Sequence, residues 1–384
     1  MKPLRIAILT HSTNPRGGVV HALEVGGALT RLGHHAVVHA PDPHGSGFFR
    51  PTVCETQPFA ASPPDADLAT MVQSRVADYV RHFEVHANRQ FDIFHAQDSI
   101  SSNALAAMQS RGLITTFVRT VHHIDHFNDP QLAALQRHAI MAADTHFTVS
   151  RHWQTVLKQD YNIQAYLAGN GVDLVRFTAA ADPADAALRK RLGLGSGPVY
   201  LAVGGIEERK NTWRILQAFQ LAHVDNPGAQ LLIAGGASLL DHRSYQQEFY
   251  TALAASGLPA CAVIVTGPLP QADMPSLYRI TDALVFPSVK EGFGLVVLEA
   301  MASRLPVITS HIAPFTEYLG DDDVIWCNPE DSTSIACAMT VVLQPERRAQ
   351  LIQNGTSIAA RYGWQAIAQA HLAVYEDIKE PANA

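Results

Sequence analysis

Short apolar runs alternate with helix-like segments along the whole chain, in two successive series. In the first series, strands are expected at 5–10, 36–39, 91–95, 116–121 and 145–149, and helices at 20–32, 68–86, 102–111 and 130–143. The second series begins near Val199, with strands expected at 199–203, 230–234, 262–265, 283–286 and 307–309. Strands joined by helical crossovers pair in parallel. The pattern therefore predicts an α/β chain of two doubly wound, Rossmann-like domains facing a central cleft, with the division near Asn170-Gly171-Val172-Asp173.

Composition narrows the class of protein. The chain has 384 residues, enough for two domains, and its content of 47% hydrophobic and 16% charged residues is typical of globular proteins. The formal net charge of −7 argues against a nucleic-acid-binding protein, which would carry a basic surface. The first ten residues lack the pattern of a signal peptide, and no apolar run reaches the roughly 18 residues of a membrane span. We therefore expect a cytoplasmic protein, with peripheral contact to a membrane left open.

Residues 287–302 combine a glycine turn with two carboxylates. An apolar run precedes the turn and a helix-forming run follows it, so the local order is strand, loop, helix. Gly292 and Gly294 allow the main chain to come close to an anion, and the N–H groups at a helix start face negative charge. Glu291 lies on the loop and Glu299 on the helix. A phosphate site is one interpretation of this segment, and an ordinary acidic helix behind a glycine turn is the other.

The spacing of Glu291 and Glu299 resembles the Glu-x7-Glu motif of family 4 retaining glycosyltransferases, which have the two-domain GT-B fold. Other segments resemble the same family, occur in the same order and extend over almost the whole chain. They are Arg16-Gly17-Gly18 with His21, residues 92–98, Thr120-Val121-His122, Val149-Ser150 with residues 170–173, residues 203–211, Thr266-Gly267-Pro268-Leu269 and Arg361-Tyr362-Gly363-Trp364.

The resemblance implies an activity, and it implies that one domain binds the acceptor and the other binds the donor. Residues 1–169 would form an N-terminal domain on the acceptor side, residues 170–360 a C-terminal domain on the donor side, and residues 361–384 a helix that crosses back to the first domain. The implied activity is the transfer of a hexose-type sugar, with retention, from a nucleoside-diphosphate sugar to an unknown acceptor. The implied enzyme needs no cofactor and no metal, because cationic side chains and a helix N-terminus would neutralise the diphosphate.

The resemblance also assigns roles to individual residues. Glu291 would contact the donor sugar near its anomeric centre, Lys210 and Arg209 would hold the diphosphate, and His122 would contact a sugar hydroxyl. Glu299 would accept hydrogen bonds from the ribose hydroxyls. The remaining donor-binding positions are Gly17, Gly18, Gly205, Gly267, Leu269, Gly292, Phe293, Gly294 and Leu295.

Three positions depart from the family pattern. Gly205 stands where arginine is common, and we expect Arg209, beside Lys210, to take over that charge. Arg304 replaces a glycine in a turn that we expect to lie on the surface, and Gln97 replaces a histidine at a strand end.

Two kinds of metal site are conceivable in the sequence. His122 and His126 are four residues apart, but their segment follows a strand and runs into a turn, so a sugar contact by His122 is the favoured interpretation. Residues 65–67 and 321–323 match Asp-x-Asp, the cation-binding string of other glycosyltransferases. Capping of a helix explains the first string and an acidic loop the second, so neither is expected to bind a metal.

Two alternatives to a transferase stay open. A sugar-nucleotide epimerase or hydrolase on the same fold would need no acceptor, and a catalytically silent sugar-nucleotide binder would explain Gly205. The Pro-, Gly- and Ser-rich segment 41–67 is expected to be a long loop that contacts the acceptor, through Phe48, Phe49 and Arg50.

Overall fold

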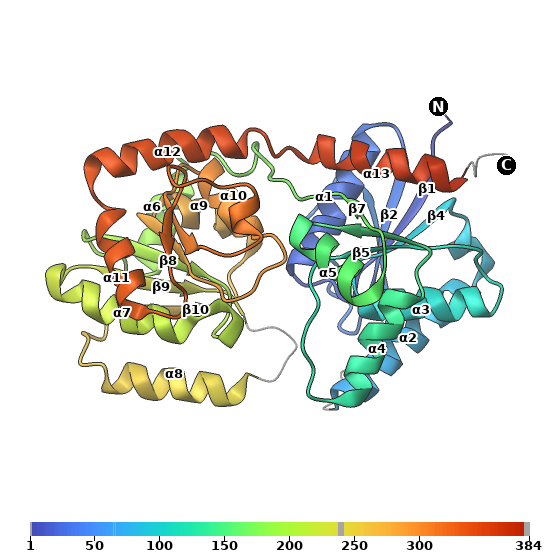
Figure 1. The fold of residues 1–384 in the computed structure, drawn as a ribbon, viewed down its shortest axis with the longest axis horizontal. Helices are drawn as coiled ribbons and strands as arrows, with labels where there is room; N and C mark the ends of the chain where they lie inside the picture. The colour runs from blue at the N-terminus through green and yellow to red at the C-terminus, as the bar shows by residue number, and fades with distance from the viewer. Residues whose placement is uncertain (1, 64, 66, 237–241, 380–384) are drawn as a thin grey trace. The chain divides into compact units, whose positions relative to one another are not determined.

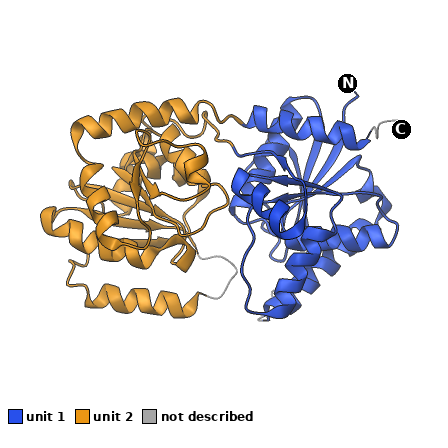
Figure 2. Ribbon diagram, in the orientation of Figure 1, with its two compact units in different colours: residues 1–170, 364–384 blue, residues 171–363 orange. Residues whose placement is uncertain are grey.

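The computed structural model describes residues 2–63, 65, 67–236 and 242–379, which form two compact units (Figure 1, Figure 2). Unit 1 comprises residues 1–170 and 364–384, and unit 2 comprises residues 171–363. The chain therefore passes from one unit to the other after Asn170 and again after Gly363. From the sequence we expected these crossings between residues 169 and 170 and between residues 360 and 361. The ends of the expected first domain and final helix, residues 1 and 380–384, lie outside the described residues.

Unit 1 contains a seven-stranded parallel sheet in the order β3-β2-β1-β4-β5-β6-β7. Its strands are β1 (Arg5–Leu9), β2 (His35–Asp42), β3 (Glu55–Ala60), β4 (Ile93–Ala96), β5 (Val118–Val121), β6 (Thr145–Thr148) and β7 (Tyr166–Leu167). Its helices are α1 (Gly17–Arg31), α2 (Leu68–Glu84), α3 (Ser99–Ser110), α4 (Pro130–Met141), α5 (Arg151–Tyr161) and α13 (Trp364–Lys379), with a 3₁₀ turn η1 (His86–Arg89).

Unit 2 contains a six-stranded parallel sheet in the order β10-β9-β8-β11-β12-β13. Its strands are β8 (Val199–Val203), β9 (Gln230–Ala234), β10 (Val263–Gly267), β11 (Ala283–Phe286), β12 (Val307–Ser310) and β13 (Ile325–Cys327). Its helices are α6 (Pro183–Arg191), α7 (Thr212–Asp225), α8 (Arg243–Ala255), α9 (Met274–Arg279), α10 (Leu295–Ala302), α11 (Ser332–Val341) and α12 (Pro345–Ala359), with 3₁₀ turns η2 (Glu208–Lys210), η3 (Gln271–Asp273) and η4 (Phe315–Glu317). The α/β architecture of two parallel, Rossmann-like sheets is therefore confirmed.

The central strands are buried on both faces, as parallel sheets covered by helices require. Every residue of β4, β5, β9, β11 and β12 is buried. In unit 2 the core gathers around Leu216 and Phe219 of α7, Leu231 of β9 and Val285 of β11. Within the described residues no helix has both the length and the apolar character needed to cross a bilayer.

The expectation of a plain loop at 41–67 is wrong, because β3 lies within it and pairs with β2. β3 is the edge strand of its sheet, and its Pro58 is allowed there because an edge strand leaves some N–H positions unpaired. Only half of its residues are even partly buried, so the strand lacks the apolar run that marks its neighbours. β7 and β13 were also not expected, and both are short edge strands.

The order of strands reverses once in each sheet, and this point positions ligands in doubly wound folds. In unit 1 the reversal lies between β1 and β4, and in unit 2 between β8 and β11. We call this place the switch point of each sheet. Chains that leave neighbouring parallel strands at this point run to opposite faces of the sheet and open a crevice at the carboxyl edge. The loops that follow these four strands are therefore the first place to look for a site.

Arg304 closes helix α10 in a conformation that favours glycine. Its φ is 60°, its N–H donates to the carbonyl of Met301, and the N–H of Leu305 donates to the carbonyl of Ala300. These two bonds form a Schellman motif, which commonly has glycine at this position because a Cβ is unfavourable at positive φ. The glycine that the family pattern has here is thus explained by the backbone.

We expect Arg304→Gly to raise the free energy of unfolding by about 0.5–1 kcal/mol. Relief of the positive-φ penalty exceeds the additional chain entropy that glycine loses on folding. Urea denaturation at neutral pH measures the change. Arg304→Ala is the control, because it removes the side chain and keeps the penalty; an equal gain in both variants would show that the side chain and not the backbone is responsible.

Candidate functional site

The loops after β8 and β11 bring two cations onto one carboxylate. Glu291 lies between β11 and α10, and Arg209 and Lys210 follow β8, the neighbouring strand. Lys210 Nζ and Arg209 Nη1 both donate to Oε1 of Glu291, at 2.7 and 2.6 Å. The side chains of Glu291, Lys210 and Arg209 are 9%, 15% and 31% exposed. Three of the four residues that the sequence suggested for catalysis therefore meet at the switch point of unit 2.

The ion pairs keep Glu291 charged although it is buried. Burial raises the pKa of the carboxyl, but the charges of Lys210 and Arg209 and the hydrogen bond from Lys210 outweigh burial and lower the pKa to about 2. Burial also lowers the pKa of the Lys210 ammonium, and the charge of Glu291 offsets only part of that effect. The three groups thus carry a net positive charge, which the buried carboxylate of Glu207, 3.9 Å from Nη2 of Arg209, partly offsets in a place where water screens charge poorly.

Two neighbours shape the slot that holds the lysine. Gly204 has a φ of 134°, and a Cβ on it would lie 3.1 Å from Cγ of Lys210, so the stem of Lys210 lies across a surface that glycine keeps free. Lys210 Nζ also lies 4.3 Å from the centre of the Phe286 ring, which favours a cation. Gly205 is buried and brings no side chain to the slot. Arg209, in contact with the same carboxylate oxygen as Lys210, is therefore the second cation of this cluster.

The turn before α10 depends on Gly294. Its φ is 95°, and a Cβ would lie 2.5 Å from Cε1 of the buried Phe315, so a larger residue does not fit. Because glycine has no side chain, the helix has no side-chain cap. The N–H of Val297 donates to the Gly294 carbonyl at 2.9 Å, and the N–H groups of Leu295 and Val296 are available to an anion. Phe293 stacks on Tyr318 at 4.7 Å, and Tyr318 Oη donates to the Phe293 carbonyl at 3.1 Å. These contacts hold the partly buried Gly292 and its turn in place.

Glu299 lies one helix turn further along α10 and has a different partner. Tyr278 Oη donates to its Oε2 at 2.7 Å. Burial, together with the charge of Glu299, raises the pKa of Tyr278, so the phenol stays protonated and the bond stays a donor-to-carboxylate bond. The carboxylate is only partly buried and keeps the capacity to accept further hydrogen bonds.

The other two donor-binding positions of unit 2 lie on an edge of the sheet. Gly267 ends β10 with a φ of 64°, and its carbonyl accepts from the N–H of Gly235 at 3.0 Å. Leu269 follows it and is partly buried. β10 is separated from β8 by β9, so these residues lie at the same carboxyl edge but two strands away from the Lys210 cluster.

The candidate residues of unit 1 meet at its own switch point. Gly17 and Gly18 follow β1, and His122 follows β5. A Cβ on Gly18 would lie 3.4 Å from Cδ2 of His122, so the missing side chain makes room for the imidazole. His122 Nε2 lies 3.0 Å from Oε1 of Gln97, which follows β4. The glycine loop expected before residue 20 is wrong in one respect, because helix α1 already begins at Gly17.

The histidines after β5 do not converge on one point. His122 contacts Gln97, whereas His123 pairs with Asp125 at 3.2 Å. In the part of the chain that the structure describes, no three His, Cys, Asp or Glu side chains gather closely enough to hold a metal ion. Asp67 caps α2 by accepting from the N–H of Thr70 at 2.7 Å; Ala66, in the same Asp-x-Asp string, lies outside the described residues.

Some residues of these sites carry no local signal in the sequence. Tyr278 contacts Glu299, Phe286 contacts Lys210, and Phe315 packs against the Gly294 turn. In the sequence, each of these aromatic residues has the pattern of an ordinary core residue. Sequence separation hides them, since Tyr278 precedes Glu299 by 21 residues. Only the strand order shows that these segments meet.

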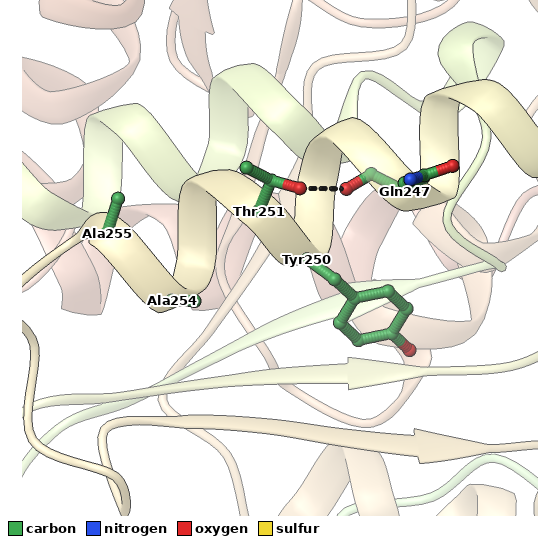
Figure 3. A pocket seen from close by; sticks show the side chains of 5 residues that line it. All are labelled: Gln247, Tyr250, Thr251, Ala254 and Ala255. Carbon is green, nitrogen blue, oxygen red and sulfur yellow. Dashed lines mark hydrogen bonds between the residues drawn. The ribbon is translucent and has the colours of Figure 1, made fainter.

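A hollow along α8 is unrelated to this chemistry. It is lined by Gln247, Tyr250, Thr251, Ala254 and Ala255 (Figure 3). The Thr251 hydroxyl donates a hydrogen bond to the Gln247 carbonyl at 2.8 Å. The lining contains no carboxylate, imidazole or cation. We therefore do not connect it with a reaction.

Sequence comparisons identify relatives along nearly the whole chain. Residues 15–176 match the family described as Glycosyltransferase Family 4, and residues 185–358 match Glycosyl transferases group 1. D-inositol 3-phosphate glycosyltransferase of Acidothermus cellulolyticus is 33% identical over 207 residues, which are 52% of this chain and 46% of that protein. The chain thus spans about half the length of that relative. The enzyme of the same name from Xylanimonas cellulosilytica is 26% identical, over 97% of this chain and 96% of its own length.

The fold agrees with these relatives. The crystal structure of Anabaena HepE in complex with UDP-glucose superposes with a TM-score of 0.78 over 97% of this chain and 100% of that one, at 19% identity. At this identity the similarity shows the fold alone. Together with the two family matches, it shows that the chain belongs to the family 4 glycosyltransferases with the GT-B fold.

Proposed function

We propose that this chain is a retaining glycosyltransferase that moves a sugar from a nucleoside-diphosphate sugar to an acceptor hydroxyl. The observation that carries the proposal is the convergence of Lys210 and Arg209 on Glu291 at the switch point of unit 2. Two cations beside an uncapped helix start suit a diphosphate, and a carboxylate among them suits an anomeric centre that becomes positive. That HepE was captured with UDP-glucose supports a nucleotide sugar as the donor.

In the proposed reaction the bond between the anomeric carbon and the diphosphate oxygen breaks, and its electron pair leaves with the phosphate. Lys210, Arg209 and the first N–H groups of α10 stabilise the charge that develops on the leaving group. The acceptor oxygen attacks the same face of the sugar and gives its proton to a phosphate oxygen, so no separate base is required. Glu291 stabilises the positive charge on the sugar, and His122 of unit 1 contacts a sugar hydroxyl.

The remaining candidates have supporting roles in the proposal. Glu299, held by Tyr278, accepts hydrogen bonds from the ribose hydroxyls. Gly292, Phe293, Gly294 and Leu295 shape the diphosphate cradle, Gly267 and Leu269 lie towards the base, and Gly17 and Gly18 let unit 1 approach the donor. We place the acceptor on unit 1.

Two other activities use the same donor site. An epimerase or hydrolase would convert the nucleotide sugar with no acceptor present, and a silent binder would leave it intact. Incubating the protein with nucleotide sugars, with and without a mixture of candidate acceptors, separates the three. Acceptor-dependent release of nucleoside diphosphate supports the transferase, and acceptor-independent conversion or an unchanged donor contradicts it.

We further propose that the reaction needs no metal, because the side-chain cations Lys210 and Arg209 would neutralise the diphosphate. A cytoplasmic location, expected from the sequence, stays part of the proposal. Turnover is expected to stay within twofold of its untreated value in excess EDTA. A metal-dependent glycosyltransferase assayed in the same buffer is the control for chelation. Loss of turnover that magnesium or manganese restores would contradict the proposed neutralisation by Lys210 and Arg209.

A further inference from the structure

A buried glutamine connects two histidines at the switch point of unit 1. Gln97, immediately after β4, is 3% exposed. Its Oε1 lies 3.0 Å from Nε2 of His122, and its Nε2 lies 3.4 Å from Nε2 of His95. His95 is itself fully buried, with Nδ1 2.6 Å from Tyr375 Oη and Nε2 2.8 Å from Thr120 Oγ1. The chain of contacts thus runs from α13 through β4 to the imidazole that follows β5.

This chain of contacts determines where the proton of His122 lies. An amide oxygen only accepts, so Gln97 Oε1 takes the hydrogen bond from an Nε2–H of His122. A neutral imidazole with its proton on Nε2 has an unprotonated Nδ1, which is an acceptor. Within the described part of the chain, Nδ1 of His122 has no hydrogen-bond partner. The amide nitrogen of Gln97 points to His95 Nε2, which accepts when His95 carries its own proton on Nδ1.

The surroundings keep His122 neutral. Burial, together with the neighbouring bases, lowers the pKa of the imidazole to about 3. The groups that face it are His123 on its own segment, His95 of β4, Arg119 of β5, His371 of α13 and His21 of α1, whose ring centre is 4.9 Å away. All of them are bases, so each opposes a second proton on His122.

We propose that Gln97 is a positioning residue that holds His122 as the neutral, Nε2-protonated tautomer and so directs Nδ1 to accept a hydrogen bond from a substrate hydroxyl. The proposal rests on the proposed function, because it assigns His122 to a sugar contact. A hydroxyl that donates to Nδ1 is oriented, whereas a protonated or reversed imidazole would offer it only an N–H. Gln97 does not touch the substrate in this scheme; it acts through His122.

The direct test is the protonation state of His122, read by NMR of histidine-labelled protein. In the wild type, His122 is expected as the Nε2–H tautomer throughout pH 5–8. Gln97→Glu places a carboxylate beside Nε2 of His122. It is expected to raise the pKa of His122 from about 3 to about 4–6, because an opposite charge at this distance favours the charged form. Gln90→Glu, an exposed glutamine of the same unit, is the control and is expected to leave His122 unchanged.

Turnover against pH supplies the second readout. In Gln97→Glu, turnover is expected to fall on the acid side with the midpoint that NMR finds for His122, while the wild type and Gln90→Glu stay level. Gln97→Leu, which neither donates nor accepts, is expected to lose about tenfold in turnover at every pH, with little change in KM for the donor. A reversed tautomer in the wild type, or identical His122 titration in Gln97→Glu, would overturn the proposal. These NMR outcomes do not depend on transferase activity, so they separate its failure from that of the proposed function.

Discussion

Glu291→Gln is expected to bind a nucleoside diphosphate about tenfold more tightly than the wild type and to transfer sugar about a hundredfold more slowly. Glu291 accepts hydrogen bonds from both cations that the leaving diphosphate needs, at 2.7 and 2.6 Å. Removing its charge frees the cations for the diphosphate, which gains about 1.4 kcal/mol for a tenfold change. The same change removes the carboxylate that would stabilise the anomeric centre, and electrostatic groups of this kind contribute about a hundredfold or more to turnover.

Calorimetric titration with nucleoside diphosphates and steady-state kinetics measure the two effects. Glu299→Gln is the matched control, because it neutralises a second carboxylate of the same helix segment, one that accepts from Tyr278. This control is expected to weaken binding where Glu291→Gln strengthens it. If Glu291→Gln bound the diphosphate no better than the wild type, Glu291 would not compete with the donor for Lys210 and Arg209.

Lys210→Ala is expected to lower turnover by about a hundredfold and Arg209→Ala by about tenfold. Each cation holds the diphosphate of the bound donor, so donor affinity falls in both variants. Each acts more strongly in the transition state, where the charge on the leaving diphosphate grows, so kcat falls further than donor affinity. Lys210 is the more buried of the two, at 15% side-chain exposure against 31%, and its charge is therefore screened less by water. A hundredfold corresponds to about 2.7 kcal/mol of activation free energy.

The double variant tests whether the two cations share one task. Both donate to the same oxygen of Glu291, so removing both is expected to cost less than the product of the single losses. Lys190→Ala, on the exposed face of α6, is the control for loss of a positive charge. An Arg209→Ala variant with wild-type turnover would mean that Gly205 is uncompensated, and the silent-binder alternative would gain support.

The sequence predicted the central strands and the edge strand β10 well, but missed the edge strands β3, β7 and β13. The expected strands 199–203, 230–234 and 283–286 agree with β8, β9 and β11, because each is an apolar run bounded by polar or turn residues. β3 begins with three polar residues, and β7 and β13 are only two and three residues long, so these edge strands give weak signals in the sequence. Helix α1 was expected to begin later than it does, because glycine is a poor helix former and Gly17 and Gly18 were assigned to a loop.

The candidate site was predictable as a list of residues but not as an arrangement. The glycines and carboxylates of 291–299 follow a recognisable spacing, whereas the meeting of Lys210 with Glu291 joins residues 81 positions apart. Only the adjacency of β8 and β11 explains that contact. The same holds for Arg304, whose conformation depends on hydrogen bonds that close α10, and for Gln97, whose partners come from separate elements.

The central claim is that unit 2 binds a nucleoside-diphosphate sugar through the Lys210 cluster. Thermal unfolding of the wild type and of Lys210→Ala, with a panel of UDP-, GDP- and ADP-sugars, tests it most directly, because a ligand that binds only the folded state raises the melting temperature. At least one nucleotide sugar is expected to raise the melting temperature of the wild type and to raise that of Lys210→Ala clearly less. A panel that shifts neither protein, or shifts both equally, would contradict the account.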